Sequence, residues 1–325
     1  MAKRNVLVKN LATIETLGCM SVLCSDKTGT LTEGKMVSGI IASHVDALNV
    51  FQKSVQNIAF LDTTLSVVEI KEYTKSAESI PAALKSVHKI SRLCNGAKFT
   101  GDDASLPMEE RAVKGDATDT AILRFAESLS FPDTGDSAAL RAAHEQLLEI
   151  PFNSKNKWML TVVQERGAGK ASDPTMLIKG APDVLFPFCT SVMNSDGSVM
   201  PVSNALRGQI STLQSEWSSE GQRVLALCHR SLQGIKVDPT QMSSNELEEM
   251  MYAEVQELTL VALVGIRDPP RYDVADALKI VRRAGVKIFM VTGDFKLTAV
   301  AIAKQVCCCR FSIDCYSRLW YRLEL

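Results

Sequence analysis

The sequence predicts an α/β protein in which one parallel-sheet unit is divided by a larger inserted α+β unit. Strand and helix patterns alternate in the outer parts of the chain, residues 20–36 and 258–306. The long middle, residues 37–257, mixes strand and helix patterns without an internal repeat. Two apolar runs of the outer parts end in polar turns, where open α/β sheets place their chemistry. The 325 residues are enough for two such units.

The first outer part contains a candidate nucleophile. A helical pattern at residues 11–17 precedes a short apolar run at residues 21–24, which is typical of a buried strand. Asp26 follows that run and opens a turn containing Gly29. A carboxylate at a strand end can attack the terminal phosphorus of ATP if Mg²⁺ and a lysine neutralise charge. Taken alone, Asp26 would be interpreted as an ordinary aspartate capping a turn.

The middle part shows one clear helix and several strands. The helix is predicted over residues 116–128, entered through Thr118 or Asp119 as N-cap. Residues 37–110 give no clear pattern apart from a polar loop at 101–107. Strands are predicted at residues 158–163, 175–178 and 223–228, the first two flanking a turn at 167–169, and a further strand at 259–264 begins the second outer part.

The second outer part repeats the strand and helix alternation. A helix is predicted over residues 273–284, with Ala277, Leu278 and Val281 on one face and a stop at Gly285. A buried strand is predicted at 287–291, and it runs into Thr292, Gly293 and Asp294. A further helix is expected over residues 297–306.

Composition excludes some classes of protein. Lysine plus arginine number 36 and aspartate plus glutamate 37, so the basic surplus of a nucleic-acid-binding protein is missing. No apolar run reaches the ~18 residues that span a bilayer, and no signal peptide is recognisable. The nine cysteines include no CxxC pair, which fits a reducing, cytoplasmic location. The group Cys307, Cys308, Cys309 and Cys315 lacks the ligand spacing of a metal site.

Several of these segments resemble P-type ATPases. The string CSDKTGTLT at residues 24–32 resembles the phosphorylation loop of that family, and KNLATIETLG at residues 9–18 its stalk. The sequence of these segments is most similar to that of the Na/K- and H/K-pumping alpha subunits and fungal relatives, and the resemblance covers roughly residues 1–306. Further matches follow in the family's order: GDATDTAIL (115–123), IPFNSKNKWM (150–159), KGAPD (179–183), RVLALC (223–228), DPPR (268–271) and MVTGD (290–294).

The resemblance implies a specific domain plan. It implies a HAD-like, doubly wound parallel-sheet phosphorylation domain, incomplete here, with an inserted α+β nucleotide-binding domain. The divisions expected are a stalk at 1–19, the phosphorylation domain at 20–36 and 258–306, the nucleotide-binding domain at 37–257 and a divergent tail at 307–325. ATP and Mg²⁺ are the implied cofactors. A monovalent cation, Na⁺ or K⁺, is implied as cargo of a full-length parent at the cytoplasmic face of a membrane.

The resemblance also assigns roles around the phosphorylation loop. Asp26 is the implied nucleophile, and with the Thr28 carbonyl it is the implied holder of Mg²⁺. Lys27 belongs to the same catalytic loop, whose backbone amides can hold phosphate oxygens. The transferred phosphate and its loop are assigned to Thr28, Thr292, Gly293 and Asp294, the last orienting the loop or the ribose region.

The nucleotide itself is assigned to a second set of residues. Phe152 is the implied stacking partner of adenine, with a place in the core as the alternative. Asp119 stands where the family usually has glutamate, which puts its contact with the base or Lys179 in doubt. Positive charge near adenine and the phosphates is assigned to Lys157, Lys179 with Gly180, and Arg223, although Lys157 alone could be a solvated charge. Asp268 and Arg271 are assigned to the sugar and phosphates, with a rigid turn as the alternative.

Two further readings concern activity. Phosphatases of the same general fold carry aspartate two positions after the nucleophile, whereas this chain has Thr28, so a long-lived phosphoenzyme is favoured over a soluble phosphatase. No GDGxNDxP-type segment, actuator domain or membrane helix is recognisable. The sequence therefore predicts ATP binding with poor or no turnover, and a nucleotide-binding remnant is the alternative. The tail is interpreted as a divergent end, with a membrane-surface helix around Trp320 as the other reading.

Overall fold

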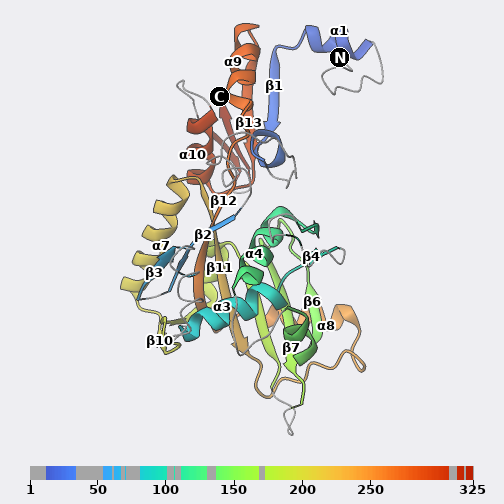
Figure 1. The fold of residues 1–325 in the computed structure, drawn as a ribbon, viewed down its shortest axis with the longest axis vertical. Helices are drawn as coiled ribbons and strands as arrows, with labels where there is room; N and C mark the ends of the chain where they lie inside the picture. Colours follow the sequence, from blue (N-terminus) through green and yellow to red (C-terminus); the bar gives the residue numbers. More distant parts are fainter. Residues whose placement is uncertain are drawn as a thin grey trace.

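The computed structural model describes residues 12–33, 54–60, 62–66, 70, 81–100, 106, 111–129, 137–167, 173–306, 313–317 and 320–324. Figure 1 shows a smaller unit, which contains β1, β13, α9 and α10, standing on a larger one built around a broad sheet. The polar loop expected at 101–107, apart from residue 106, lies outside the described residues. The same is true of the first 11 residues of the stalk and of Cys307, Cys308 and Cys309.

The larger unit is built on a nine-stranded sheet. Its order is β10-β9-β12-β11-β8-β7-β6, and β2 and β3 branch from β12. All pairs are antiparallel except β12 with β9. The strands are β2 (Ser54–Ala59), β3 (Thr64–Ser66), β6 (His144–Ile150), β7 (Trp158–Glu165), β8 (Thr175–Gly180), β9 (Cys189–Met193), β10 (Val199–Pro201), β11 (Gln222–Ser231) and β12 (Leu258–Arg267).

Helices cover both faces of this sheet, so the unit has three layers. Leu84, Ile122 and Leu177 belong to the apolar core on one face, and Trp217, Met251 and Ile178 to the core on the other. Leu177 and Ile178 are consecutive in β8 and enter opposite cores, because successive side chains of a strand point to opposite faces of the sheet. The first face carries α3 (Ala82–Leu93), α4 (Ala117–Ser128) and α5 (Ser137–Ala143). The second carries α6 (Pro182–Leu185), the turn η3 (Phe186–Phe188), α7 (Asn204–Ser219) and α8 (Ser244–Ala253).

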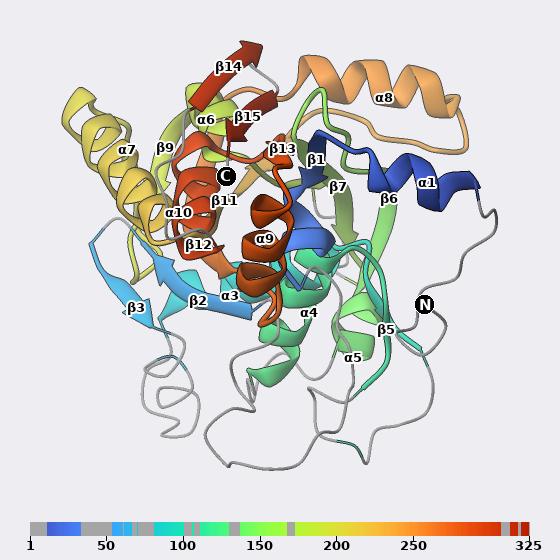
Figure 2. The same cartoon turned by 90° about the horizontal axis from the view of Figure 1, so that it is seen from above.

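The smaller unit has its own sheet and core. Its strand order is β1-β13-β15-β14, and only β1 and β13 run parallel. Ile288, Leu278 and Ile302 pack together in a core distinct from those of the larger unit. The elements are α1 (Ala12–Gly18), β1 (Val22–Asp26), the turn η2 (Lys27–Leu31), α9 (Val274–Arg283), β13 (Lys287–Thr292), α10 (Lys296–Val306), β14 (Ile313–Ser317) and β15 (Trp320–Glu324). Viewed from above, α10 lies beside α7 of the larger unit (Figure 2).

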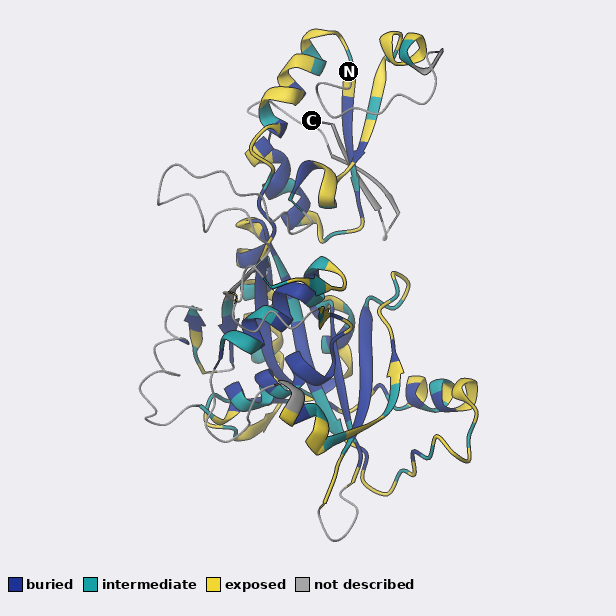
Figure 3. Ribbon diagram, turned by 45° about the vertical axis from the view of Figure 1, so that its right-hand side comes forward, coloured by how far each residue is buried: buried dark blue, intermediate teal, exposed yellow. Residues whose placement is uncertain are grey.

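Most predicted elements are present, and three details are wrong. The run at 21–24 is not buried: Val22 is 45% exposed, because β1 is an edge strand that pairs only with β13 among the described residues (Figure 3). The N-cap of α4 is Asp116, whose extended backbone lets its carboxylate accept hydrogen bonds from the Thr118 and Asp119 amides. Trp320 lies in β15, so the helix considered for the tail is a strand.

The chain returns from the larger unit to the smaller unit within residues 267–273. β12 hydrogen-bonds to β11, β9 and β2, so by sheet membership it belongs to the larger unit through Arg267. The division expected between residues 257 and 258 would separate this central strand from its own sheet. Among the described residues, none of the helices combines the length and the apolar character needed to cross a bilayer.

Candidate functional site

The parallel pairing of β1 with β13 brings the two predicted phosphate loops together. Asp26 stands opposite Val291 in the register, so the turn after Asp26 and the turn of Thr292, Gly293 and Asp294 begin side by side. Asp26 is exposed, and Thr292 is 3% exposed. The Thr292 hydroxyl accepts a hydrogen bond from the Asp294 amide at 3.2 Å, which closes the second turn.

The turn after Asp26 is held against the chain that returns from the larger unit. Gly29 adopts a φ of 78°, which favours glycine at this bend. Thr32 ends the turn, and its hydroxyl donates a hydrogen bond to the buried Asp268 carboxylate at 3.0 Å. The Arg271 amide donates to the Leu31 carbonyl at 3.0 Å. Asp268 and the Arg271 backbone therefore support the turn that follows Asp26.

Asp294 connects the two units electrostatically. Its carboxylate forms ion pairs with Lys27, which is 1% exposed, and with Arg223 of β11. Arg223 also donates to the Thr118 hydroxyl at 3.0 Å, at the start of α4. The neighbouring Asp294 carboxylate raises the pKa of the Arg223 guanidinium, so this cation stays charged. One carboxylate thus connects the turn after Asp26 to β11 and, through Arg223, to the start of α4 in the larger unit.

A second cluster lies between β8 and α4. Lys179 and Asp119 form an ion pair at 2.7 Å, and their side chains are 5% and 16% exposed. The other Asp119 oxygen accepts from the Gly96 amide at 2.8 Å. The shorter acid therefore does reach Lys179, which removes the doubt about that contact. Burial raises the pKa of the nearby Cys94 thiol to about 11, so Cys94 is neutral and cannot compete for Lys179.

The aromatic candidate stands on a turn beside this cluster. Phe152 is 59% exposed, so its alternative reading as a core residue is wrong. Lys157, at the end of the same turn, has a φ of 58° and accepts a hydrogen bond from the Ala181 amide at 3.0 Å. A side-chain carbon on Gly180 would come within 2.6 Å of the Lys157 carbonyl oxygen. Glycine is therefore required where β7 and β8 meet.

Lys27, Asp268, Arg223 and Asp294 belong to the first cluster and Lys179 and Asp119 to the second, whereas Phe152 and Lys157 lie on the turn beside the second cluster. The Arg271 guanidinium is 42% exposed and pairs with Asp273 at 3.7 Å, so only its backbone joins the site. Sequence reasoning missed Thr118 as an Arg223 partner, Thr32 as an Asp268 partner and Gly96 as an Asp119 partner. Thr118 and Thr32 were within quoted motifs, but nothing in the sequence distinguished their hydroxyls from other polar groups.

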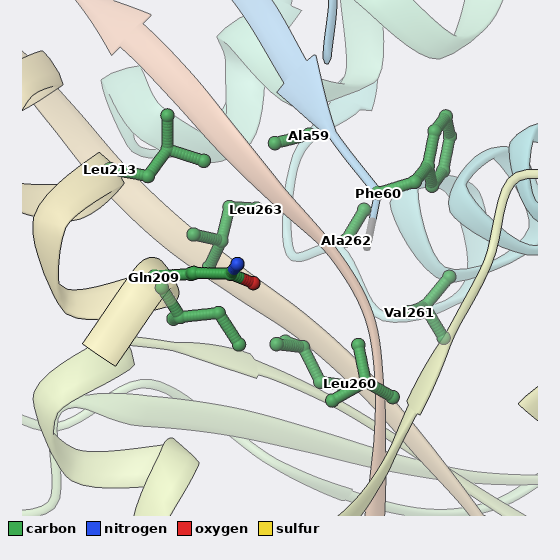
Figure 4. Close-up of a pocket in the computed structure, with 10 residues that line it drawn as sticks. Ala59, Phe60, Gln209, Leu213, Leu260, Val261, Ala262 and Leu263 are labelled. Atoms are coloured by element: carbon green, nitrogen blue, oxygen red, sulfur yellow. The ribbon is translucent and has the colours of Figure 1, made fainter. Parts of the chain in front are cut away.

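A third feature, an apolar pocket under α7, does not suit a charged ligand. It has a volume of about 70 Å³ and lies between α7 and the strands β2 and β12 (Figure 4). Gln209 supplies the only polar side chain, and Leu213, Leu260 and Leu263 form much of the rest. Without a cation it offers no attraction for a phosphate.

The chemistry of the donors fits a magnesium nucleotide at the two clusters. An exposed aromatic face on Phe152 and the cations of Lys157 and Lys179 suit a base and its phosphates. Magnesium is commonly held by one or two carboxylates, phosphate oxygens and water. Of the two oxygen donors that the resemblance assigns to Mg²⁺, Asp26 and Thr28, the Asp26 carboxylate belongs to an exposed residue. Among the described residues there is no group of three or more acids, cysteines or histidines that would form a complete metal cage.

Comparisons with known proteins agree with this arrangement. A family model described as "P-type ATPase, cytoplasmic domain N" matches residues 83–273, more than half of the chain. The chain is 34% identical over 313 residues to potassium-transporting ATPase alpha chain 2 of Oryctolagus cuniculus, covering 94% of this chain and 26% of that protein. It is 35% identical over 309 residues to sodium/potassium-transporting ATPase subunit alpha-4 of Rattus norvegicus, with 94% and 27% covered. The chain thus spans about a quarter of the length of these relatives.

Proposed function

We propose that this chain, which belongs to the P-type ATPase family, holds ATP in its larger unit and presents the terminal phosphate to Asp26 in the smaller one. The observation that carries this proposal is the double ion pair of Asp294, with Lys27 beside the nucleophile and with Arg223 in the nucleotide unit. A carboxylate shared in this way links nucleotide binding to the phosphorylation loop.

The smaller unit is proposed to be a HAD-like phosphorylation domain. The parallel pair β1 and β13 with the loops at their carboxyl ends supports this, because that edge is the reactive one in doubly wound sheets. The larger unit, from residue 37 to the end of β12, is then the inserted nucleotide-binding domain. Residues 1–19 are proposed as a stalk and residues 307–325 as a divergent tail.

The nucleotide is proposed to lie between the aromatic turn and the cations. Phe152 offers its exposed face to adenine, Lys157 supplies positive charge beside that base, and Lys179 attracts the phosphates. Asp119 and Gly180 fix the position of the Lys179 ammonium and its strand. Arg223 stands farther along, where it can reach both a phosphate oxygen and Asp294. Asp268 acts through Thr32 on the loop, and Arg271 supports that loop through its backbone.

The reaction proposed is phosphoryl transfer to a carboxylate. An Asp26 oxygen bonds to the terminal phosphorus while the bond from that phosphorus to the bridging oxygen breaks, and ADP leaves. Lys27, Thr28, Thr292 and Gly293 surround the transferred group and offset its charge. Mg²⁺, when bound through Asp26 and Thr28, supplies further neutralisation. Because Thr28 cannot act as an acid or base, water attacks the acyl phosphate slowly.

Cation transport is proposed only for a longer protein that contains this chain. The relatives are named as potassium-transporting and sodium/potassium-transporting ATPases, so Na⁺ or K⁺ is the proposed cargo. We propose the cytoplasmic face of a membrane as the location of the chain within such a protein.

The test is acid-stable label from γ-labelled ATP. The chain and its Asp26→Asn variant are incubated with labelled ATP and Mg²⁺, and the labelled peptide is identified by mass spectrometry. We expect a low level of label on Asp26 alone, in keeping with the poor turnover predicted from the sequence. Label that survives in Asp26→Asn would overturn the assigned nucleophile. ATP binding without any label would favour nucleotide binding as the whole function of this chain.

A further inference from the structure

The turn between Phe152 and Lys157 depends on contacts from outside its own sheet. Within the turn, the Asn156 amide donates to the Asn153 side chain at 2.8 Å and the Lys157 amide to the Asn153 carbonyl at 2.8 Å. Lys157 nevertheless adopts a φ of 58°, a left-handed conformation that side chains other than glycine rarely adopt. Such a residue persists only where its surroundings hold it.

Helix α8 supplies those surroundings. Tyr252 accepts a hydrogen bond from the Asn156 side-chain amide at 3.1 Å. Its ring also lies 5.3 Å from the Trp158 ring, at an interplanar angle of 53°. Asn156 and Trp158 are the two residues on either side of Lys157. One tyrosine therefore contacts both neighbours of the strained lysine.

The helix that presents Tyr252 is itself firmly anchored. Ser243 and Glu246 form a capping box at its first turn. Leu247 and Met251 are 2% and 0% exposed in the core under the sheet. At its end, Arg230 of β11 donates to the Glu254 carbonyl at 2.7 Å and pairs with the Glu254 carboxylate at 2.8 Å. A side chain on such a helix can fix the position of a less regular turn.

The contacts of Tyr252 also affect the residues proposed to bind the nucleotide. The Lys157 carbonyl accepts a hydrogen bond from the Ala181 amide, which joins the turn to the residue that follows β8. Phe152 stands at the other end of the same turn, with its ring 59% exposed. A loose turn would leave this ring many orientations, and ordering them on binding would weaken affinity.

We propose that Tyr252 is a positioning residue for the base-binding turn, which fixes Phe152 and Lys157 in the orientation that receives the adenine of ATP. This inference rests on the proposed nucleotide function. It concerns the base and not the phosphates, because the hydrogen bond and the ring contact that Tyr252 makes within the described part of the chain are both to residues of the turn, Asn156 and Trp158.

The experiment separates base from phosphate recognition. Dissociation constants for ATP, adenosine and inorganic tripolyphosphate are measured by calorimetry on the whole chain and on Tyr252→Phe and Tyr252→Ala. Loss of one hydrogen bond in Tyr252→Phe should weaken ATP and adenosine binding roughly two- to tenfold. Tyr252→Ala should weaken both further, because the ring contact with Trp158 is also lost. The affinity for tripolyphosphate, which has no base, should stay within about twofold of the wild-type value.

A matched control uses an exposed tyrosine. Tyr272 is 81% exposed, and Tyr272→Phe should leave all three constants unchanged. The inference is overturned if Tyr252→Phe and Tyr252→Ala bind ATP as tightly as the wild type, or if tripolyphosphate affinity falls by the same factor as ATP affinity. A wild-type chain without affinity for ATP would overturn the proposed function itself and this inference with it. Circular dichroism identifies a misfolded Tyr252→Ala, in which case Tyr252→Phe decides alone.

Discussion

Replacing Asp119 by asparagine removes one charge from a nearly buried ion pair. The Lys179 ammonium is 2.7 Å from Asp119 and its side chain is 5% exposed, so water cannot replace the lost carboxylate. Breaking a buried pair from one side typically costs about 3–5 kcal/mol. We expect about 3 kcal/mol for Asp119→Asn, the low end of that range. The reason is that Asp119 is 16% exposed and the amide oxygen can still accept from Gly96.

An exposed ion pair of nearly the same length provides the control. Lys279 and Asp276 lie 2.9 Å apart on α9, and their side chains are 58% and 79% exposed. Asp276→Asn removes the same charge from a similar geometry in water. Exposed pairs contribute about 0–1 kcal/mol, so this variant should lose no more than that.

Urea unfolding followed by tryptophan fluorescence measures both variants, because Trp158 and Trp217 are buried in the larger unit. Lys179→Met removes the cation instead, and the double variant with Asp119→Asn should lose less stability than the two single losses added together. Equal losses in Asp119→Asn and Asp276→Asn, or strict additivity in the double variant, would refute the reasoning from burial.

Three further predictions concern pH, a close backbone contact and thiols. Burial, reinforced by Arg92, lowers the pKa of His88 to about 3, so the stability present above pH 6.5 is lost as the pH falls. About 3 kcal/mol should be lost between pH 6.5 and 4, and His88→Gln should remove this part of the slope in urea titrations at each pH. Gly180→Ala should cost roughly 1–3 kcal/mol in the same assay because β7 and β8 must separate, whereas Gly208→Ala, on an open helix face, should not destabilise. In the folded chain, iodoacetamide should label the exposed thiols of Cys19 and Cys24 and leave the buried thiols of Cys94, Cys189 and Cys228 unlabelled, among the described residues. Peptide mass spectrometry can check this pattern.

The family and most regular elements could be predicted from the sequence. The P-type ATPase family prediction is confirmed, and the strands β7, β8, β11 and β12 and the helices α4, α9 and α10 contain the predicted ranges or nearly so. These segments have clear apolar periods, and α9 stops where Gly285 takes a φ of 82°. α3 and β2 were missed because residues 37–110 were interpreted as having no clear pattern, although Leu84, Val87 and Ile90 of α3 follow a helical spacing and lie in the core.

Sheet membership was the part of the fold that local patterns could not provide. β12 reads as an apolar strand, but whether it joins the larger or the smaller sheet depends on its partners, β11 and β2. The exposure of β1 could not be predicted for the same reason, because an apolar run does not show whether its strand lies at the edge or in the middle of a sheet.

The candidate site residues come from the resemblance, and apart from the contact of Asp119 with Lys179 their partners in the structure were not predicted. The resemblance selected Lys179, Arg223 and Asp294, and the structure shows which opposite charges or hydroxyls each one meets. Tyr252 was not selected because α8 lies about a hundred positions after the turn it contacts and matches no quoted motif. Contacts of this kind depend on how two distant elements pack, which single-sequence periodicity does not encode.

The most direct test of ATP binding in the larger unit is hydrogen–deuterium exchange of the chain with and without magnesium and ATP. We expect slower exchange of backbone amides at residues 150–158, 179–183 and 115–122, which include the turn, the end of β8 and the start of α4. Residues 204–219, which form α7 beside the apolar pocket, should exchange at the same rate in both samples. No change at the turn, or protection confined to α7, would contradict it.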